Sequence, residues 1–191
     1  MQQEDDALRS ISLHPLVKRL LALRGLNTPE KIAAFLHPSR EHLGDPFLLK
    51  GMAEATVLIR QAVSAGQRIA VYGDYDADGV TSTALMVRSL RMLGAEVEAY
   101  IPDRFREGYG LHAEALQDLA RRGHQLVITV DSGISSVQEA ELASRLGMTL
   151  IITDHHQPPP ELPKADALIN PKQPDCPYPF KQLAGGGVAF K

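Results

Sequence analysis

From residue 68 onward, short apolar runs alternate with longer segments whose apolar residues recur at helical spacing. The short runs are rich in valine and isoleucine and end at glycine or polar residues, a pattern that is typical of buried strands. Strands are expected at 68–73, 96–101, 126–130 and 149–153, with a fifth at 167–169. Helices are expected between them at about 80–93, 112–122 and 136–146. Strands that alternate with helices of this length indicate βαβ units. We therefore predict an α/β fold with a mostly parallel sheet of about five strands flanked by helices.

The first 66 residues lack this alternation and show helical periodicity instead. Helices are expected at 16–23, 30–36 and 52–65. Thr28 followed by Pro29 offers an N-cap and a proline at the first helical position, which is a common helix start. We predict a helical leader at 1–66 and an α/β domain at 67–191. Because residues 185–191 indicate a helix that is opened and not completed, we expect that domain to be truncated at its C-terminal end.

Clustered metal-type ligands follow three of the predicted strands. The first strand runs into three carboxylates, the third ends at one, and the fourth ends at a carboxylate and two imidazoles: Asp74, Asp76, Asp78, Asp131, Asp154, His155 and His156. The carboxyl ends of parallel strands share one edge of the sheet, where open α/β folds bind their ligands. So many acidic groups would repel one another without bound cations. The pattern therefore predicts a divalent-metal centre, and paired metals suit hydrolysis or transfer at phosphorus.

Each of these motifs also has an ordinary structural interpretation. Asp76 and Asp78 form D-x-D-x-G, and such a turn commonly caps a following helix. His155 and His156 are adjacent, so an extended chain cannot aim both at one point. A lone motif of either kind would favour the structural interpretation. Their recurrence at equivalent strand ends favours a placed site.

A second group of candidate residues follows the predicted strand at 96–101. Arg104 lies on the same sheet edge as the acids, where its guanidinium could hold a phosphate by two hydrogen bonds. Tyr109 lies between two glycines and could stack on a base or pack its own loop. We expect both residues to contact substrate, with the packing role for Tyr109 left open.

Composition and charge add limits without naming a function. The formal net charge is -3, so nothing at this level indicates a nucleic-acid binder, although bound cations would offset part of the acidity. A single cysteine excludes an internal disulfide and fits a reducing compartment. The first ten residues, MQQEDDALRS, are acidic and polar, unlike a signal peptide, and no apolar stretch is long enough to cross a membrane. We therefore expect a soluble protein of the cytoplasm.

Five motifs, in this order and spacing, resemble the DHH phosphoesterase superfamily: GDYDADG, RFREGYGL, VDSGIS, TDHH and LAGGGVAF. Within it, the chain is most similar to bacterial exonucleases that are specific for single-stranded DNA. The resemblance implies a 5′-to-3′ exonuclease that acts on single-stranded DNA in recombination and repair, with two Mn²⁺ or Mg²⁺ ions. It implies no membrane partner and identifies no protein partner.

The resemblance also assigns roles, residue by residue. Asp76 would bind one metal and Asp78 the other, with Asp131 bridging both. His155 would complete the shell of the second metal, and His156 would lie near the scissile phosphate, so that His156 and Asp131 are the catalytic residues. Asp154 would orient a histidine, and Asp74 would support the ligands in the same indirect way. Mixed carboxylate and imidazole ligands suit Mn²⁺ at least as well as Mg²⁺.

Two other functions remain as alternatives. One is a small-molecule DHH phosphatase or cyclic-dinucleotide phosphodiesterase, against which the leader and the long GYGL motif argue. The other is a non-catalytic scaffold with a DHH fold, against which the complete set of acids and histidines argues. The family supplies one more metal-binding aspartate after the glycine-rich segment at 184–190. We therefore expect this chain to be inactive in isolation.

Overall fold

The computed structural model describes residues 12–191, so the acidic N-terminal segment discussed above lies outside the described residues. The chain forms two compact units, of which the first ends at Leu43 and the second spans Gly44–Lys191. The domain boundary at residue 66 remains a sequence-based prediction.

In its described residues, 12–43, the first unit contains two short helices, α2 (Pro15–Leu23) and α3 (Pro29–Leu36), and the 3-10 helix η1 (Arg40–His42). The cap predicted before α3 is present, because the Thr28 hydroxyl accepts the Lys31 amide at 3.3 Å. Leu21 and Ile32, one from each α-helix, are buried against each other. This small apolar contact is what holds the helix pair together.

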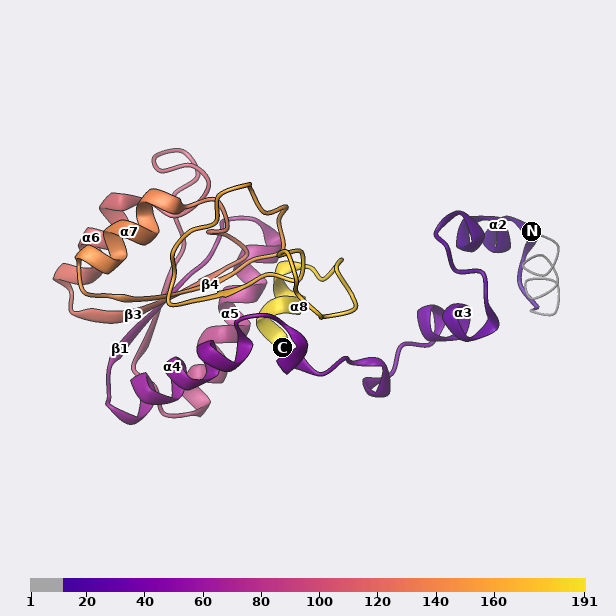
Figure 1. Cartoon of the computed structure of the whole chain (residues 1–191), viewed down its shortest axis with the longest axis horizontal. Helices are drawn as coiled ribbons and strands as arrows, with labels where there is room; N and C mark the ends of the chain where they lie inside the picture. The colour runs from indigo at the N-terminus through magenta and orange to yellow at the C-terminus, as the bar shows by residue number, and fades with distance from the viewer. Residues whose placement is uncertain (1–11) are drawn as a thin grey trace. The chain divides into compact units, whose positions relative to one another are not determined.

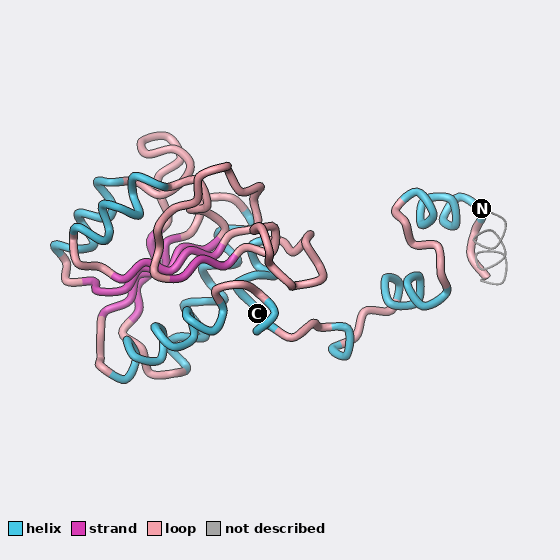
Figure 2. The backbone as a smooth tube through the Cα atoms, viewed as in Figure 1, coloured by secondary structure: helices cyan, strands magenta, loops and turns pink. Residues whose placement is uncertain are grey.

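The second unit is a five-stranded sheet covered by helices (Figures 1 and 2). Its strands are β1 (Arg68–Tyr72), β2 (Val97–Tyr100), β3 (His124–Val130), β4 (Thr149–Thr153) and β5 (Ala167–Ile169). Its helices are η2 (Pro46–Leu48), α4 (Met52–Ser64), α5 (Ala77–Met92), α6 (Ala113–Arg121), α7 (Val137–Arg145) and α8 (Gly185–Phe190). Every strand pair is parallel. The predicted α/β class and the five-stranded parallel sheet are confirmed.

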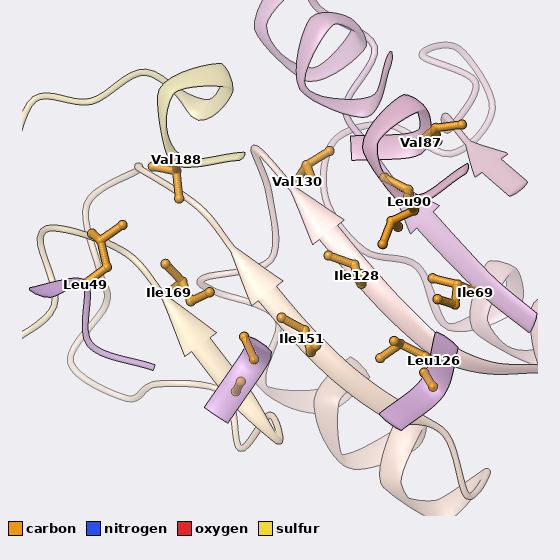
Figure 3. Packing of buried hydrophobic residues seen from close by; sticks show 14 of the residues in the cluster. Leu49, Ile69, Val87, Leu90, Leu126, Ile128, Val130, Ile151, Ile169 and Val188 are labelled. Carbon is orange, nitrogen blue, oxygen red and sulfur yellow. The ribbon is translucent and has the colours of Figure 1, made fainter. Parts of the chain in front are cut away.

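Two apolar layers arise from the alternation of side chains along the strands. Ile69, Ile128 and Ile151 face one side, where they pack with residues of α4, α5 and α8 (Figure 3). Tyr72 and Val127 face the other side, where they pack with residues of α6 and α7. The sheet is therefore buried on both faces, which explains why its strands are continuous apolar runs in the sequence.

The strand order is β2-β1-β3-β4-β5, so the direction in which the chain winds reverses between β1 and β3. Open parallel sheets bind ligands at the carboxyl ends of the strands on either side of such a reversal. The acids after β1 and β3 lie at that point.

Helix α5 begins at Ala77, earlier than the predicted start near residue 80. The cause is the Asp76 side chain, whose Oδ1 accepts the amides of Asp78 and Gly79 at 2.8 and 2.9 Å. Asp76 is thus an N-cap, and Asp78 lies in the first helical turn. Gly79 is required by a close approach, since a Cβ there would lie 2.5 Å from the carbonyl oxygen of Asp74. The start of α5 is therefore pressed against the end of β1.

Among residues 12–191, no helix is both long enough and apolar enough to span a membrane.

Candidate metal centre

The carboxylates and imidazoles at the three strand ends gather into one cluster. The cluster contains two sets of three residues, and within each set the ligand atoms all lie within 4.8 Å of one another. One set is Asp131, His155 and His156, and the other is Asp74, Asp76 and Asp131. Asp131 belongs to both. The first set joins the ends of β3 and β4, and the second joins the ends of β1 and β3. The structure thus brings together side chains that are far apart in the sequence.

Asp131 is the central group of this cluster. Its backbone has a φ of 61°, in the left-handed region that aspartate tolerates better than most residues. The residue is 1% exposed, and its Oδ1 accepts no hydrogen bond. Nε2 of His155 lies 2.9 Å from this oxygen without hydrogen-bond geometry. Burial, together with the nearby Asp78 and Asp76 carboxylates, raises the pKa of Asp131 to about 7. A buried carboxylate oxygen that accepts no hydrogen bond and lies among other acids is the environment that a divalent cation would satisfy.

Asp154 holds the two histidines in place. It is fully buried, and its Oδ1 accepts the amides of His155 and His156 at 2.6 and 3.0 Å. The same oxygen lies 2.7 Å from Nδ1 of His156. Oδ2 accepts the amide of Ile134 at 3.0 Å, which ties the loop after β3 to the end of β4. With Nδ1 engaged, Nε2 is the ring nitrogen of His156 that remains for a ligand.

The pKa values of Asp154 and His156 reflect this contact. Burial alone would raise the pKa of Asp154, but hydrogen bonds from the His156 ring, the His156 amide and the Ile134 amide lower it overall. The same hydrogen bond raises the pKa of His156. The pair therefore favours a charged carboxylate beside a protonated imidazole in the metal-free protein.

Asp78 is held by a segment that follows it by more than a hundred residues. Its Oδ2 accepts the amide of Gly185 and its Oδ1 the amide of Gly186, both at 2.7 Å. A Cβ at Gly185 would lie 2.4 Å from Oδ1 of Asp131, so only glycine fits there. Helix α8 therefore contacts two of the predicted metal ligands at once.

The roles of Asp76 and Asp78 as metal ligands remain predictions. Asp76 caps α5, as its ordinary structural interpretation predicts, and still lies within the cluster. Asp78 lies outside both ligand sets, and its Oδ2 is 3.6 Å from Nε2 of His155. Because each carboxylate oxygen has two lone pairs, accepting an amide leaves room for a metal.

The loop after β2 reaches the cluster through Arg104 and Tyr109. The Arg104 guanidinium lies 5.1 Å from the ring centre of Tyr75, the residue between Asp74 and Asp76. The Tyr109 hydroxyl lies 3.2 Å from Nδ1 of His156, and the two rings meet edge-on. Burial, followed by the nearby carboxylates, raises the pKa of Tyr109, so its phenol stays protonated. Both residues border the site, and their contact with substrate remains a prediction.

Sequence reasoning missed Gly185 and Gly186 as partners of the site. The run of three glycines before a helix is a visible signal, but nothing local in the sequence shows that it meets Asp78.

Comparison with known proteins agrees with the fold. Residues 68–191 match the DHH family, N-terminal domain. The single-stranded-DNA-specific exonuclease RecJ of Bacillus subtilis is 53% identical over 192 residues, covering 98% of this chain and 24% of that protein. RecJ from Thermus thermophilus in complex with Mn²⁺ is similar with a TM-score of 0.74 and 33% identity, over 99% of this chain and 26% of that one. Its complex with Mg²⁺ gives a TM-score of 0.59 and 29% identity, over 99% of this chain and 22% of that one. This chain thus spans about a quarter of the length of the Bacillus subtilis relative.

Proposed function

This chain belongs to the DHH family, and we propose that it carries the metal centre of a 5′-to-3′ exonuclease that hydrolyses single-stranded DNA. The observation that carries the proposal is Oδ1 of Asp131, which is buried, accepts no hydrogen bond and lies where both ligand sets meet. The proposal is supported by the extensive similarity to exonucleases of that specificity.

The residues present fit a centre of two divalent ions. Asp76, Asp131 and His155 offer oxygen and nitrogen ligands within one cluster, and Asp78 lies at its border. The mixture of donors suits Mn²⁺, and Mg²⁺ would use the carboxylates. Such ions, when bound, supply an activated water and stabilise the charge that develops on phosphate oxygens.

The chain's own residues would position the other participants. Asp154 fixes the ring of His156, so that its Nε2 has one orientation toward a scissile phosphate. Tyr109 contacts the same ring and keeps a protonated hydroxyl beside it. Arg104 is exposed at the edge of the cluster, where it would bind a phosphate of the strand. The same proposal includes a role in recombination and repair and a location in the cytoplasm.

A chimera tests this function in a complete enzyme. The chain would replace the 192 residues of Bacillus subtilis RecJ with which it aligns. With Mn²⁺, we expect the chimera to shorten 3′-labelled single strands progressively and to release a 5′ label at once as a mononucleotide. A duplex with blunt ends should persist. A well-folded chimera that leaves single strands intact would overturn the proposal, and release of a 3′ label first would overturn the polarity.

Assays of the isolated chain give the matching comparison. We expect it to fold and to leave labelled single-stranded DNA intact, because it spans about a quarter of the length of the Bacillus subtilis exonuclease. Digestion by the isolated chain at the rate of the chimera would show that this chain alone suffices.

A further inference from the structure

Phe105 is the most exposed large apolar side chain among the described residues, with 96% of its surface accessible. Burial of apolar surface is the main term that stabilises a fold, and this ring contributes almost none of it. Arg104 and Arg106 flank it and are exposed as well. An exposed aromatic ring between two cations is the combination that single-strand binding sites use.

The turn that carries Phe105 is held by its own hydrogen bonds. Oδ1 of Asp103 accepts the amide of Phe105 at 2.8 Å and that of Arg106 at 3.3 Å. The Glu107 carboxylate accepts the Asp103 amide at 2.7 Å and the Tyr100 hydroxyl at 2.6 Å. Since Tyr100 belongs to β2, these contacts fasten the turn to the sheet and present the ring in a defined place.

Both flanks of this turn lie beside the candidate metal centre. Before the ring, Arg104 lies over Tyr75, which separates two of the clustered acids. After the ring, Tyr109 contacts His156. The exposed ring of Phe105 is thus on the loop that borders the site.

Tyr109 was the aromatic residue expected from the sequence to stack on a base or to pack its loop. In the structure its hydroxyl and the edge of its ring are engaged by His156. No ring contact is found for Phe105 among residues 12–191, so both of its faces are available.

We propose that Phe105 stacks on a base of a bound single strand whose phosphates are contacted by Arg104 and Arg106. This inference rests on the proposed function. Single-strand binding sites combine cations that follow the backbone with aromatic rings that stack on bases of any sequence. A duplex keeps its bases stacked on one another, so the same ring would favour an unpaired strand over a paired one.

The absence of tryptophan from the chain makes the contact directly observable. Phe105→Trp introduces a single indole, whose emission is quenched when a base stacks on it. The 191-residue chain carrying this change would be titrated in Mg²⁺ with a short oligothymidylate and with an abasic oligomer of equal length. Oligomer length would be checked after each titration. We expect quenching by oligothymidylate and none by the abasic oligomer. Met92→Trp is the matched control, because Met92 is 85% exposed in the last turn of α5, which ends at the opposite edge of the sheet.

Affinity measured by anisotropy of labelled oligomers gives an independent result. Phe105→Ala should bind oligothymidylate at least about fivefold more weakly and bind the abasic oligomer as the unchanged chain does. Phe105→Tyr should restore affinity, whereas Phe105→Leu, which keeps apolar surface without a ring, should not.

Contrary outcomes separate the inference from the function on which it rests. If the unchanged chain binds oligothymidylate while Phe105→Ala binds equally well and the indole emission of Phe105→Trp stays constant, stacking is refuted and the proposed function stands. If the unchanged chain binds neither oligomer, the inference falls together with single-strand binding by this chain. A blue shift of the indole emission with protein concentration, without DNA, would show that a second copy covers the ring and would overturn the inference.

Discussion

The carboxylate of Asp78 accepts the backbone amide of Gly185 at 2.7 Å, and this contact joins the first turn of α5 to the first turn of α8. The same glycine touches Asp131, because a Cβ there would lie 2.4 Å from Oδ1 of that residue. One backbone position therefore sets the place of two predicted metal ligands.

Gly185→Ala should disturb the centre while leaving most of the fold intact. The added methyl group must displace the Asp131 carboxylate, an overpacking that costs about 1–3 kcal/mol of unfolding free energy. In the chimera, displacement of ligands should lower activity about 10- to 100-fold. Gly187→Ala is the control, because its Cβ would meet the flexible end of Leu183 at 3.2 Å. Thermal unfolding and Mn²⁺-dependent digestion, measured for both variants, check this. If the two variants have equal melting temperatures and equal activities, Gly185 has no role in placing the predicted ligands.

Asp131→Asn should abolish digestion by the chimera without unfolding it. Asparagine tolerates the left-handed backbone of this position and keeps the side-chain shape, but it lacks the charge that would bind a metal. We expect activity to fall by more than about 100-fold, beyond the loss typical of outer residues around a metal. Asp175→Asn is the matched control, since Asp175 is exposed and has a φ of 60°. Near-normal turnover of Asp131→Asn in saturating Mn²⁺ would remove Asp131 from the mechanism.

Arg104→Ala should weaken the binding of single strands and flatten its dependence on salt. Loss of one phosphate contact lowers the slope of log affinity against log salt by about 0.7. A charged hydrogen bond of this kind corresponds to roughly 10-fold in affinity. Binding would be measured over a series of salt concentrations in the chimera inactivated by Asp131→Asn. Arg145→Ala provides the comparison, because Arg145 is exposed in the last turn of α7, away from the cluster. An unchanged slope and affinity would leave Arg104 with a packing role on Tyr75.

The metal-free chain should become less stable as pH rises from about 4 to about 6.5. The folded-state pKa of Asp131 is raised to about 7, so the folded chain binds more protons than the unfolded chain in this window. The stability that Asp131 contributes is fully present below its pKa in the unfolded chain. It is lost as pH rises through its pKa in the folded chain. The pKa of Asp74 is also raised, so its titration lowers the stability in the same direction as pH rises. The raised pKa of His156 does so only above pH 6.5, the pKa of an unfolded histidine. The pKa of Asp154 is lowered, so the stability that this carboxylate contributes is lost only as pH falls below 3.8, outside this window.

Melting temperatures in EDTA at about pH 5 and pH 6.5 test this. The decrease in melting temperature between the two pH values should be smaller in Asp131→Asn, where only the titration of Asp74 still contributes to it. In Asp175→Asn the decrease should equal that of the unchanged chain. Because a metal binds the deprotonated carboxylate, added Mn²⁺ should stabilise the chain more at the higher pH. Equal decreases in the two variants would show that Asp131 is not the titrating group.

The sheet was predictable because both of its faces are buried. Runs such as Leu126–Val130 carry an apolar signal at nearly every position, and three of the five end where candidate ligands begin. Even the short β5 was located at its observed bounds, Ala167–Ile169. Helix α5 starts earlier than the pattern of apolar residues predicts, because Asp76 caps the helix and is also a member of the cluster.

The parts of the site that escaped prediction depend on contacts between distant segments. The meeting of Gly185 with Asp78 follows from how α8 packs on α5, which the sequence pattern does not encode locally. The backbone of Asp131 is similar, since its left-handed conformation is set by the turn after β3. Exposure of Phe105 was also hidden, because a phenylalanine in a loop can be either buried or free.

The position of β1 between β2 and β3 has a consequence for how the chain is made. This strand pairs with β2 on one side and with β3 on the other, where Arg68 lies opposite His124. During synthesis from the amino end, β1 and β2 leave the ribosome before β3 does. Until then the apolar β1 has one edge of unpaired amides and carbonyls, which is a template for association with other chains. Completion of the sheet must therefore wait for residues 124–130, and nascent chains that stall before that segment should be those that most need chaperones.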